Sequence, residues 1–151
     1  MTVHAFPKPD NEAVLAVRYG GAVPRYTSYP TAPHFTGLVN AAVYADWLGR
    51  IGADDKVSLY LHIPFCNELC WYCGCYTKIV RRYRPVAAYL ETLLAEIDMV
   101  ASKLGGRPEA TCIHFGGGSP TILSPDDWRR VLDRLRARFD VAPDAEIAVE
   151  I

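Results

Sequence analysis

Residues 56–76 read KVSLYLHIPFCNELCWYCGCY, and this stretch decides the fold class. Its first part, residues 56–63, is rich in β-branched and aromatic residues, which predicts a strand. Four of the chain's five cysteines follow, separated by three, two and one residues: Cys66, Cys70, Cys73 and Cys75. A disulfide between such close cysteines would close a very short loop and constrain the unfolded chain little. The spacing therefore favours several thiolates that bind one centre.

Two further short runs predict strands, ATCIHF at 110–115 and AEIAVEI at 145–151. A helical pattern lies between the first strand and the second, with Pro85 in its first turn and the glycine pair 105–106 at its end. Its apolar residues recur with helical spacing and form one face. They are Val86, Leu90, Leu93, Leu94, Ile97 and Val100.

A second helical pattern lies between the second strand and the third. Ser124 is its predicted N-cap, Pro125 occupies the first turn and Asp127 the capping-box position. Its predicted inward stripe comprises Trp128, Val131, Leu132, Leu135 and Phe139. The order strand, helix, strand, helix, strand predicts right-handed crossovers and a parallel sheet, as in doubly wound or barrel α/β proteins.

The N-terminal third has a different character. Residues 39–52 have the pattern of one short helix, and residues 23–37 are rich in proline, which predicts an ordered but irregular arm. We therefore divide the chain into an arm with a short helix, residues 1–52, and a sheet-forming region, residues 53–151. Because the third strand would end the chain with no helix to cover it, we expect the N-terminal part of a longer protein.

The composition is that of an ordinary globular protein. The 151 residues are half hydrophobic and carry a formal net charge of −1, which argues against disorder and against a general nucleic-acid coat. The N-terminal residues lack the pattern of a signal peptide, and no run is long and apolar enough for a membrane span. We expect a cytoplasmic, reducing location, which favours metal or redox chemistry of the cysteines over disulfides.

The cysteine segment follows the first strand directly, and ligands bind at the carboxyl ends of strands in parallel α/β sheets. A structural zinc site remains an alternative, although it normally uses two ligand pairs with a longer spacer. A thiol redox couple would need only Cys70 and Cys73 and would leave Cys66 and Cys75 without a role. Four buried, inert cysteines so close together would be unusual, so an iron–sulfur cluster is the favoured interpretation.

The cysteines also carry a family resemblance. CxxxCxxC at residues 66–73, with Tyr72 before the last cysteine, resembles the signature of radical S-adenosylmethionine (SAM) enzymes. YLHIPFC before it, GC at 74–75 after it and PRYTSYPTAPHF at 24–35 resemble the oxygen-independent coproporphyrinogen III oxidases (dehydrogenases) of haem synthesis. The resemblance covers residues 23–151. It implies the first three βα elements of a partial (β/α)₆ barrel, preceded by the arm.

The resemblance also implies a chemistry. Cys66, Cys70 and Cys73 would bind three irons of a 4Fe-4S cluster and leave the fourth iron open for SAM. The cluster would donate one electron, and the resulting 5′-deoxyadenosyl radical would remove hydrogen from propionates of coproporphyrinogen III. Loss of carbon dioxide from two propionates would give protoporphyrinogen IX. A reduced donor such as flavodoxin or ferredoxin would supply the electron, and we expect a monomer that binds neither nucleic acid nor membrane.

Six further residues are assigned to the binding of two SAM molecules through the resemblance: Tyr60, Tyr72, Gly117, Gly118, Ser119 and Glu150. Each has a plainer interpretation. A glycine run is often only a tight turn, aromatic residues often pack on half-buried strands, and a glutamate at a strand end often faces water. We assign no catalytic residue beyond the cluster and SAM site.

Three further features bear on the function. Cys75 matches a fourth family cysteine, and we predict that it does not bind the cluster. Its presence favours the dehydrogenase over the related haem chaperones, which are one alternative function. A zinc-binding or redox-sensing module is a second alternative. His62 and His114 are interpreted as structural residues. The run KIVRRYR, residues 78–84, is either a solvated basic face or an attraction for substrate carboxylates.

Overall fold

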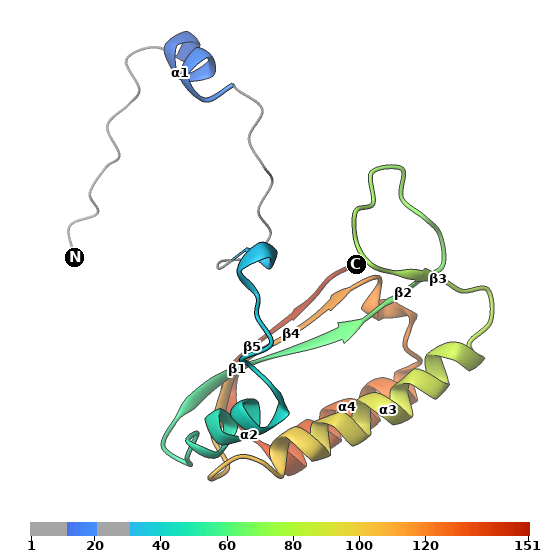
Figure 1. Cartoon of the computed structure of the whole chain (residues 1–151). Coiled ribbons are helices and arrows are strands. Elements are labelled where there is room, and N and C mark those ends of the chain that lie inside the picture. The colour runs from blue at the N-terminus through green and yellow to red at the C-terminus, as the bar shows by residue number, and fades with distance from the viewer. Residues whose placement is uncertain (1–11, 21–30) are drawn as a thin grey trace. The chain divides into compact units, whose positions relative to one another are not determined.

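The computed structural model of the chain describes residues 12–20 and 31–151 (Figure 1). The chain divides into two compact units, residues 1–38 and residues 39–151. None of the helices within the described ranges is both long enough and apolar enough to cross a membrane.

The first unit contains one helix, α1 (Glu12–Tyr19), and one short 3-10 helix, η1 (Ala32–His34), among its described residues. The hydroxyl of Thr31 and Nδ1 of His34 are 2.9 Å apart, which ties the start of η1 to its end. Most of the predicted arm, residues 23–30, lies outside the described residues. The irregular arm therefore stays a prediction over that segment.

The second unit opens with α2 (Ala41–Gly49), which confirms the short helix predicted within residues 39–52. Its N-cap is Asn40, whose side-chain oxygen accepts hydrogen bonds from two backbone N–H groups of the first turn, at 3.0 and 3.1 Å. This unit begins at Val39, so α2 lies with the sheet, whereas the sequence groups it with the arm.

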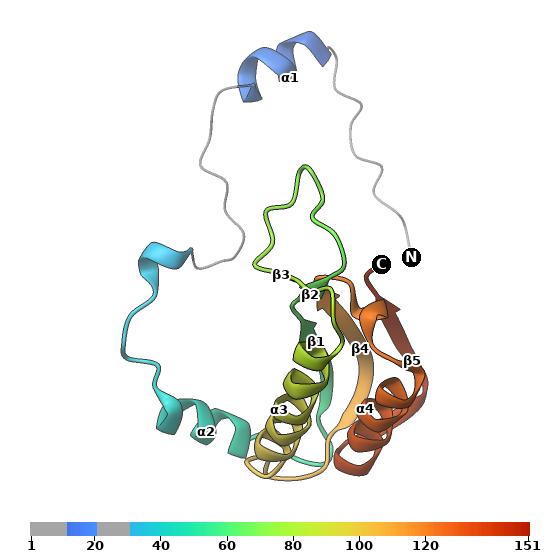
Figure 2. The ribbon, with the colours of Figure 1, turned by 90° about the vertical axis from the view of Figure 1, so that its right-hand side faces the viewer.

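Three parallel strands form the main sheet, in the order β1 (Lys56–Ile63), β4 (Glu109–Gly117), β5 (Asp140–Val149). The connecting helices α3 (Arg84–Ala101) and α4 (Pro125–Arg138) both cover the same face of this sheet (Figure 2). The predicted α/β class with a parallel sheet is confirmed. Over the described residues the sheet is open, as expected for the first part of a partial barrel.

The start of β5 differs from the prediction. The strand begins and ends earlier than the predicted range, 145–151. Pro143 has no N–H to donate to a ladder, which argues against a strand at that position in the sequence. In the structure the pairing with β4 shifts register between Ala110 and Cys112, and Pro143 lies in the irregular part of β5 opposite this shift.

Glu150 lies one residue beyond the end of β5, so its predicted place on the third strand is wrong by one position. Its backbone N–H nevertheless donates to the carbonyl of Phe115 at 3.0 Å. This bond continues the pairing with β4 past the strand and holds Glu150 at the carboxyl edge of the sheet.

The apolar face of α3 is buried as predicted, with Val86, Leu90, Leu93, Leu94 and Ile97 inside. The predicted end of the helix is wrong. The helix stops at Ala101, where the N–H and the hydroxyl of Ser102 donate to carbonyls of the last turn. The glycine pair 105–106 lies further on, where the chain passes so close to residues 49–53 that a Cβ atom would meet their backbone.

The core fills the space between the sheet and the two helices. Phe115 is fully buried and meets the ring of Trp128 edge to face, with 4.6 Å between ring centroids. Burial of each large apolar side chain of this kind contributes about 1.5–3 kcal/mol. The predicted inward stripe of α4 is confirmed by its buried residues, Val131, Leu135 and Phe139, against which Trp128 and Leu132 pack.

The N-terminus of α4 is tied to the segment before α3. Ser124 accepts a hydrogen bond from the N–H of Asp127 and donates one to its carboxylate, which confirms the predicted cap. The hydroxyl of Tyr83 donates to the same carboxylate and accepts from the N–H of Ser124 at 2.9 Å. The bond from Tyr83 is the main reason why the pKa of Asp127 is lowered.

A second, two-stranded parallel ladder, β2 (Phe65–Cys66) with β3 (Lys78–Ile79), holds the base of the cysteine loop, residues 66–77, which begins with the last residue of β2. The end of β4 passes directly against this ladder. The N–H of Gly118 donates to the carbonyl of Ile63 at 2.9 Å, and a Cβ at Gly118 would stand 2.5 Å from the carbonyl oxygen of Phe65 and 2.9 Å from Sγ of Cys66. Only glycine fits this crossing.

We expect Tyr83→Phe to lower the free energy of unfolding by about 1 kcal/mol, because the N–H of Ser124 and the carboxylate of Asp127 each lose a partner. The folded-state pKa of Asp127 lies below its usual value of 3.8, so this contribution is present above that pH and is lost as the pH falls through the lowered pKa. Urea unfolding at several pH values measures the difference. Tyr76→Phe, at an exposed position, is the control.

We expect Gly118→Ala to destabilise the chain by about 1–3 kcal/mol, because the added methyl group collides with the backbone of Phe65 and with Cys66. Gly74→Ala is the matched control, since a Cβ at Gly74 has no atom within 4 Å. Thermal unfolding of both variants tests the close crossing. Equal stability of the two variants would contradict it.

Candidate functional site

All three strands of the main sheet point in the same direction, so their carboxyl ends lie together at one edge (Figure 1). The cysteine loop extends from this edge after β1, the glycine segment 116–118 ends β4, and Glu150 follows β5. This is the edge at which parallel α/β proteins bind ligands. Segments far apart in the sequence therefore meet at one candidate site.

The cysteine loop presents its thiols unevenly. Cys66 and Cys73 are half-buried, while Cys70 and Cys75 are exposed. The N–H of Cys73 donates to the carbonyl of Cys70 at 3.0 Å, which forms a turn between these two cysteines. None of the five cysteines, all of which lie in described segments, is part of a disulfide. The thiols are therefore available as ligands.

The structure does not gather the thiols into a finished metal site. Among the described residues, no three side chains of histidine, cysteine, aspartate or glutamate are arranged to hold a metal ion. The donor set itself fits an iron–sulfur cluster, because three free thiols lie on one loop at the ligand-binding edge. Metal sites commonly form only when the metal binds, so the three sulfurs would converge on loading.

Neighbouring atoms crowd each glycine of the segment. A Cβ at Gly116 would stand 2.8 Å from the carboxylate of Glu150, and one at Gly117 would stand 2.5 Å from the ring of His62. Gly117 also has a φ of +109°, a value that residues with a side chain rarely adopt. The crowding at the end of β4 thus explains the run of glycines. Because these residues lack side chains, their backbone groups are exposed at the site.

Ser119 follows the glycines and connects them to the cysteine loop. Its N–H donates to the carbonyl of Phe65 at 2.8 Å, and its hydroxyl lies 3.8 Å from Sγ of Cys66. The structure therefore brings Gly118, Ser119 and Cys66 together, as expected if they share one cofactor site. It does not bring Tyr72 to them, because that side chain is 91% exposed.

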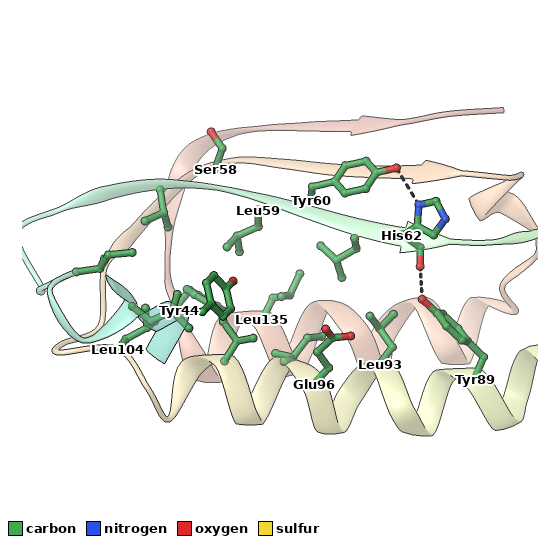
Figure 3. Close-up of a pocket in the computed structure, with 17 residues that line it drawn as sticks. Tyr44, Ser58, Leu59, Tyr60, His62, Tyr89, Leu93, Glu96, Leu104 and Leu135 are labelled. Carbon is green, nitrogen blue, oxygen red and sulfur yellow. Dashed lines mark hydrogen bonds between the residues drawn. The ribbon is translucent and has the colours of Figure 1, made fainter. Parts of the chain in front are cut away.

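A polar group lies on the face of the sheet that α3 and α4 leave uncovered, and we call it the open-face group: Tyr60, His62, His114 and Glu150. The hydroxyl of Tyr60 lies 3.1 Å from Nδ1 of His62, and a dashed line marks this hydrogen bond in Figure 3. Nε2 of His114 is 3.2 Å from the Glu150 carboxylate, whose other oxygen accepts from the N–H of Gly117 at 2.9 Å.

The charges of the open-face group are set by these contacts. The N–H of Gly117, and next the ring of His114, lower the pKa of Glu150, so its carboxylate is ionised at neutral pH. Burial, followed by the charges of Glu150 and Cys75, raises the pKa of Tyr60, which stays neutral. The group can therefore offer a ligand one carboxylate, one hydroxyl and two imidazoles.

Cys75 is influenced by charges on the loop and in this group. Its pKa is raised, first by the charge of Cys73 and further by the charges of Glu150 and Cys66. The raised pKa makes its thiolate less available than an ordinary one.

Two members of the open-face group were missed as site residues from the sequence. The alternation of β1 does place Tyr60 and His62 on the same face. The pairing of Tyr60 with His114, by contrast, depends on the register between β1 and β4, which the sequence does not reveal. Since both histidines contact predicted site residues, they belong to the candidate site.

A pocket of about 370 Å³ lies on the other side of β1, next to the open-face group (Figure 3). Its walls come from β1 and from α2, α3 and α4, and they are mostly apolar. At one end the hydroxyl of Tyr89 donates to the carbonyl of His62 at 2.6 Å. Burial raises the pKa of Tyr89, which stays a neutral donor and fixes the end of β1 to α3.

Comparison with known proteins agrees with this architecture. The model of the radical SAM superfamily matches residues 60–151. A Bradyrhizobium diazoefficiens protein described as an oxygen-independent coproporphyrinogen III oxidase is 54% identical over 140 residues, which are 92% of this chain and 31% of that protein. A Mannheimia haemolytica protein of the same description is 41% identical over 140 residues, covering 93% of this chain and 94% of its own length.

A solved structure of the Escherichia coli coproporphyrinogen III oxidase HemN, described as a radical SAM enzyme, superimposes with a TM-score of 0.77 at 34% identity. The match covers 91% of this chain and 30% of HemN. The chain thus spans about a third of the length of HemN and of the Bradyrhizobium relative. It belongs to the radical SAM superfamily and, within it, to the family of oxygen-independent coproporphyrinogen III oxidases.

Proposed function

We propose that this chain forms the cofactor-binding part of a radical SAM oxidoreductase that decarboxylates two propionates of coproporphyrinogen III to give protoporphyrinogen IX. The observation that carries the proposal is the cysteine loop with the spacing CxxxCxxC, packed through Cys66 against a glycine segment at the carboxyl edge of a parallel sheet. The substrate is taken from the name of the relatives, which are up to 54% identical to this chain.

Cys66, Cys70 and Cys73 are the proposed ligands of a 4Fe-4S cluster. Three thiolates leave one iron without a protein ligand, as catalytic metal sites do when a co-substrate must bind. When bound, the cluster would supply one electron to the sulfonium of SAM, so that one carbon–sulfur bond breaks and methionine and the 5′-deoxyadenosyl radical are formed. The protein's part is to position the reactants and to exclude competing reactions.

The proposed SAM site combines the glycine segment with the open face. Gly117, Gly118 and Ser119 bring exposed backbone next to Cys66, where the amino acid part of SAM would lie. Tyr60 and Glu150 contribute a hydroxyl and an ionised carboxylate on the same side of the sheet. Tyr72 is proposed to join them when the loop folds around the cluster.

Glu150 is held in place before any ligand binds. Its carboxylate accepts from Gly117 and contacts His114, so its position and its charge are both fixed. A fixed carboxylate can accept hydrogen bonds from a ligand without a large loss of side-chain freedom. We propose that Glu150 orients SAM and that two SAM molecules share the Gly117–Ser119 segment, as the resemblance implies.

The proposal includes three partners. Coproporphyrinogen III is the substrate, and a reduced carrier such as flavodoxin or ferredoxin is the electron donor. A one-electron acceptor takes the electron that each propionate radical releases together with carbon dioxide. Cys75 is not assigned to the cluster, since Cys66, Cys70 and Cys73 already provide three thiolates.

A haem chaperone would share the fold and the cluster, but it would bind haem without release of carbon dioxide. Product analysis with coproporphyrinogen III therefore separates these two functions.

We expect anaerobically reconstituted protein to produce 5′-deoxyadenosine when it is incubated with dithionite and SAM. The reason is that an iron without a protein ligand can bind SAM and pass on the electron that dithionite supplies. Liquid chromatography of the quenched mixture measures the product. A protein that holds the full cluster and leaves SAM intact would contradict the proposal.

We expect Cys66→Ser, Cys70→Ser and Cys73→Ser each to abolish the brown absorbance of the cluster, because each variant loses one thiolate ligand. Cys75→Ser should keep the absorbance and is the matched control within the same loop. Cys112→Ser, on β4, controls for the loss of a thiol elsewhere. Loss of colour in Cys75→Ser alone would show that the ligand assignment is wrong.

A further inference from the structure

A second pocket, of about 310 Å³, lies beside the cysteine loop. It is formed by the start of the loop, by the segment that leads into α3 and by the short 3-10 helix η2 (Pro120–Ile122). We call it the arginine pocket, and its lining residues are Asn67, Val80, Arg81, Arg82, Tyr83, Thr121 and Ile122.

The walls of the arginine pocket are fixed by the fold. The N–H of Val80 donates to the carbonyl of Cys66 at 3.0 Å, and that of Ile122 donates to the carbonyl of Ser119 at 2.9 Å. Both side chains pack against the core. Tyr83 is held by Ser124 and Asp127. The two arginines therefore project from an anchored segment of backbone.

The arginines of the pocket have no partners within the chain as described. Neither Arg81 nor Arg82 makes an ion pair or a side-chain hydrogen bond with the residues that the structure describes, and the same holds for the neighbouring Lys78 and Arg84. All the remaining arginines of the second unit form an ion pair with a carboxylate or donate to a backbone carbonyl: Arg50, Arg107, Arg129, Arg130, Arg134, Arg136 and Arg138. The unpaired positive charge of the unit is thus concentrated here.

Nearby acids do not neutralise this charge. Asp127 is the carboxylate bonded to Tyr83, and its oxygens are already engaged by Tyr83, Ser124 and Arg130. Glu68, next to Asn67 in the described loop, makes no hydrogen bond or ion pair with either pocket arginine. A pair of free guanidinium groups on a fixed segment suits an external carboxylate or phosphate.

The side of the sheet on which the pocket lies decides which anion it receives. Val80 and Ile122 pack on the core that α3 and α4 cover, whereas the open-face group, proposed to bind SAM, lies on the opposite face. A substrate that loses hydrogen to the 5′-deoxyadenosyl radical must bind on the same face of the sheet as SAM. The placement therefore favours an anion that approaches from outside the catalytic cavity, rather than a substrate propionate.

The pocket also adjoins the proposed cluster. Asn67 follows Cys66 directly, and Ser119, whose hydroxyl contacts Sγ of Cys66, immediately precedes η2. A carrier protein bound at the pocket would be next to a ligand of the centre that must receive an electron. Positive surface charge at such a point increases the association rate of an acidic partner by about 10- to 1000-fold.

We propose that the arginine pocket is the docking point of an acidic one-electron carrier protein, whose surface carboxylates bind Arg81 and Arg82. The inference rests on the proposed function, since it assumes a cluster at Cys66, Cys70 and Cys73. The reduced carrier loses one electron and the oxidised cluster gains it, with no bond made or broken and no proton moved.

The test compares two reductants on the same cluster-loaded chain. Stopped-flow absorbance follows reduction of the cluster by a reduced flavodoxin of negative net charge and, separately, by dithionite. In the double variant Arg81→Glu/Arg82→Glu we expect reduction by flavodoxin to slow at least about tenfold at low ionic strength. Reduction by dithionite, a small anion that needs no docking surface, should slow far less, and the difference between variant and parent should shrink as salt is added.

Lys103→Glu is the matched control, because it reverses an exposed charge beyond the C-terminus of α3. It should leave both rates unchanged. If the double charge reversal does not fold, the double neutralisation Arg81→Gln/Arg82→Gln replaces it. This variant should slow reduction of the cluster by flavodoxin to an intermediate extent. Calorimetric titration with oxidised flavodoxin gives an independent dissociation constant, which should weaken in the same order.

Unchanged reduction by flavodoxin and an unchanged dissociation constant in the double reversal would overturn the inference. A variant that loses affinity for coproporphyrinogen III but not for flavodoxin would also overturn it, because the pocket would then serve the substrate. Both results differ from failure of the proposed function, in which the parent chain itself holds no cluster or leaves SAM intact with dithionite.

Discussion

The candidate site depends on one close crossing, where Gly118 passes over the ladder that holds the base of the cysteine loop. Two backbone hydrogen bonds fix it, from Gly118 to Ile63 and from Ser119 to Phe65, at 2.9 and 2.8 Å. A Cβ at Gly118 would collide with the Phe65 carbonyl and with Cys66. Because of this crossing, a loop that follows β1 and a segment that ends β4 lie side by side, although they are about fifty residues apart in the sequence.

The two faces of the sheet then take different roles at the same edge. The helices α3 and α4 cover one face and bury the core, with Phe115 and Trp128 at its centre. The other face carries the open-face group, where Gly117 and His114 keep the carboxylate of Glu150 ionised. Cofactor binding is proposed for the open face and electron entry for the covered face, so that the two processes do not compete for one surface.

Much of this could be predicted from the sequence, because periodicity and capping are local properties. The strand of β1, the apolar face of α3 and the cap of α4 at Ser124 were all predicted correctly. The early start of β5 was not, because Pro143 argues against a strand and is tolerated only where the pairing shifts register. The open-face group was missed in part, because the meeting of Tyr60 with His114 depends on strand register and on packing between distant segments.

The central claim is that Cys66, Cys70 and Cys73 together hold one iron–sulfur cluster. Among the described residues the thiols lie on one loop but are not arranged as a metal site. The claim therefore concerns the arrangement that the loop adopts when metal is supplied. The most direct test is the metal and sulfide content of the chain after anaerobic reconstitution. The account predicts about four iron and about four sulfide per chain. One tightly bound zinc per chain, with no iron, would contradict it.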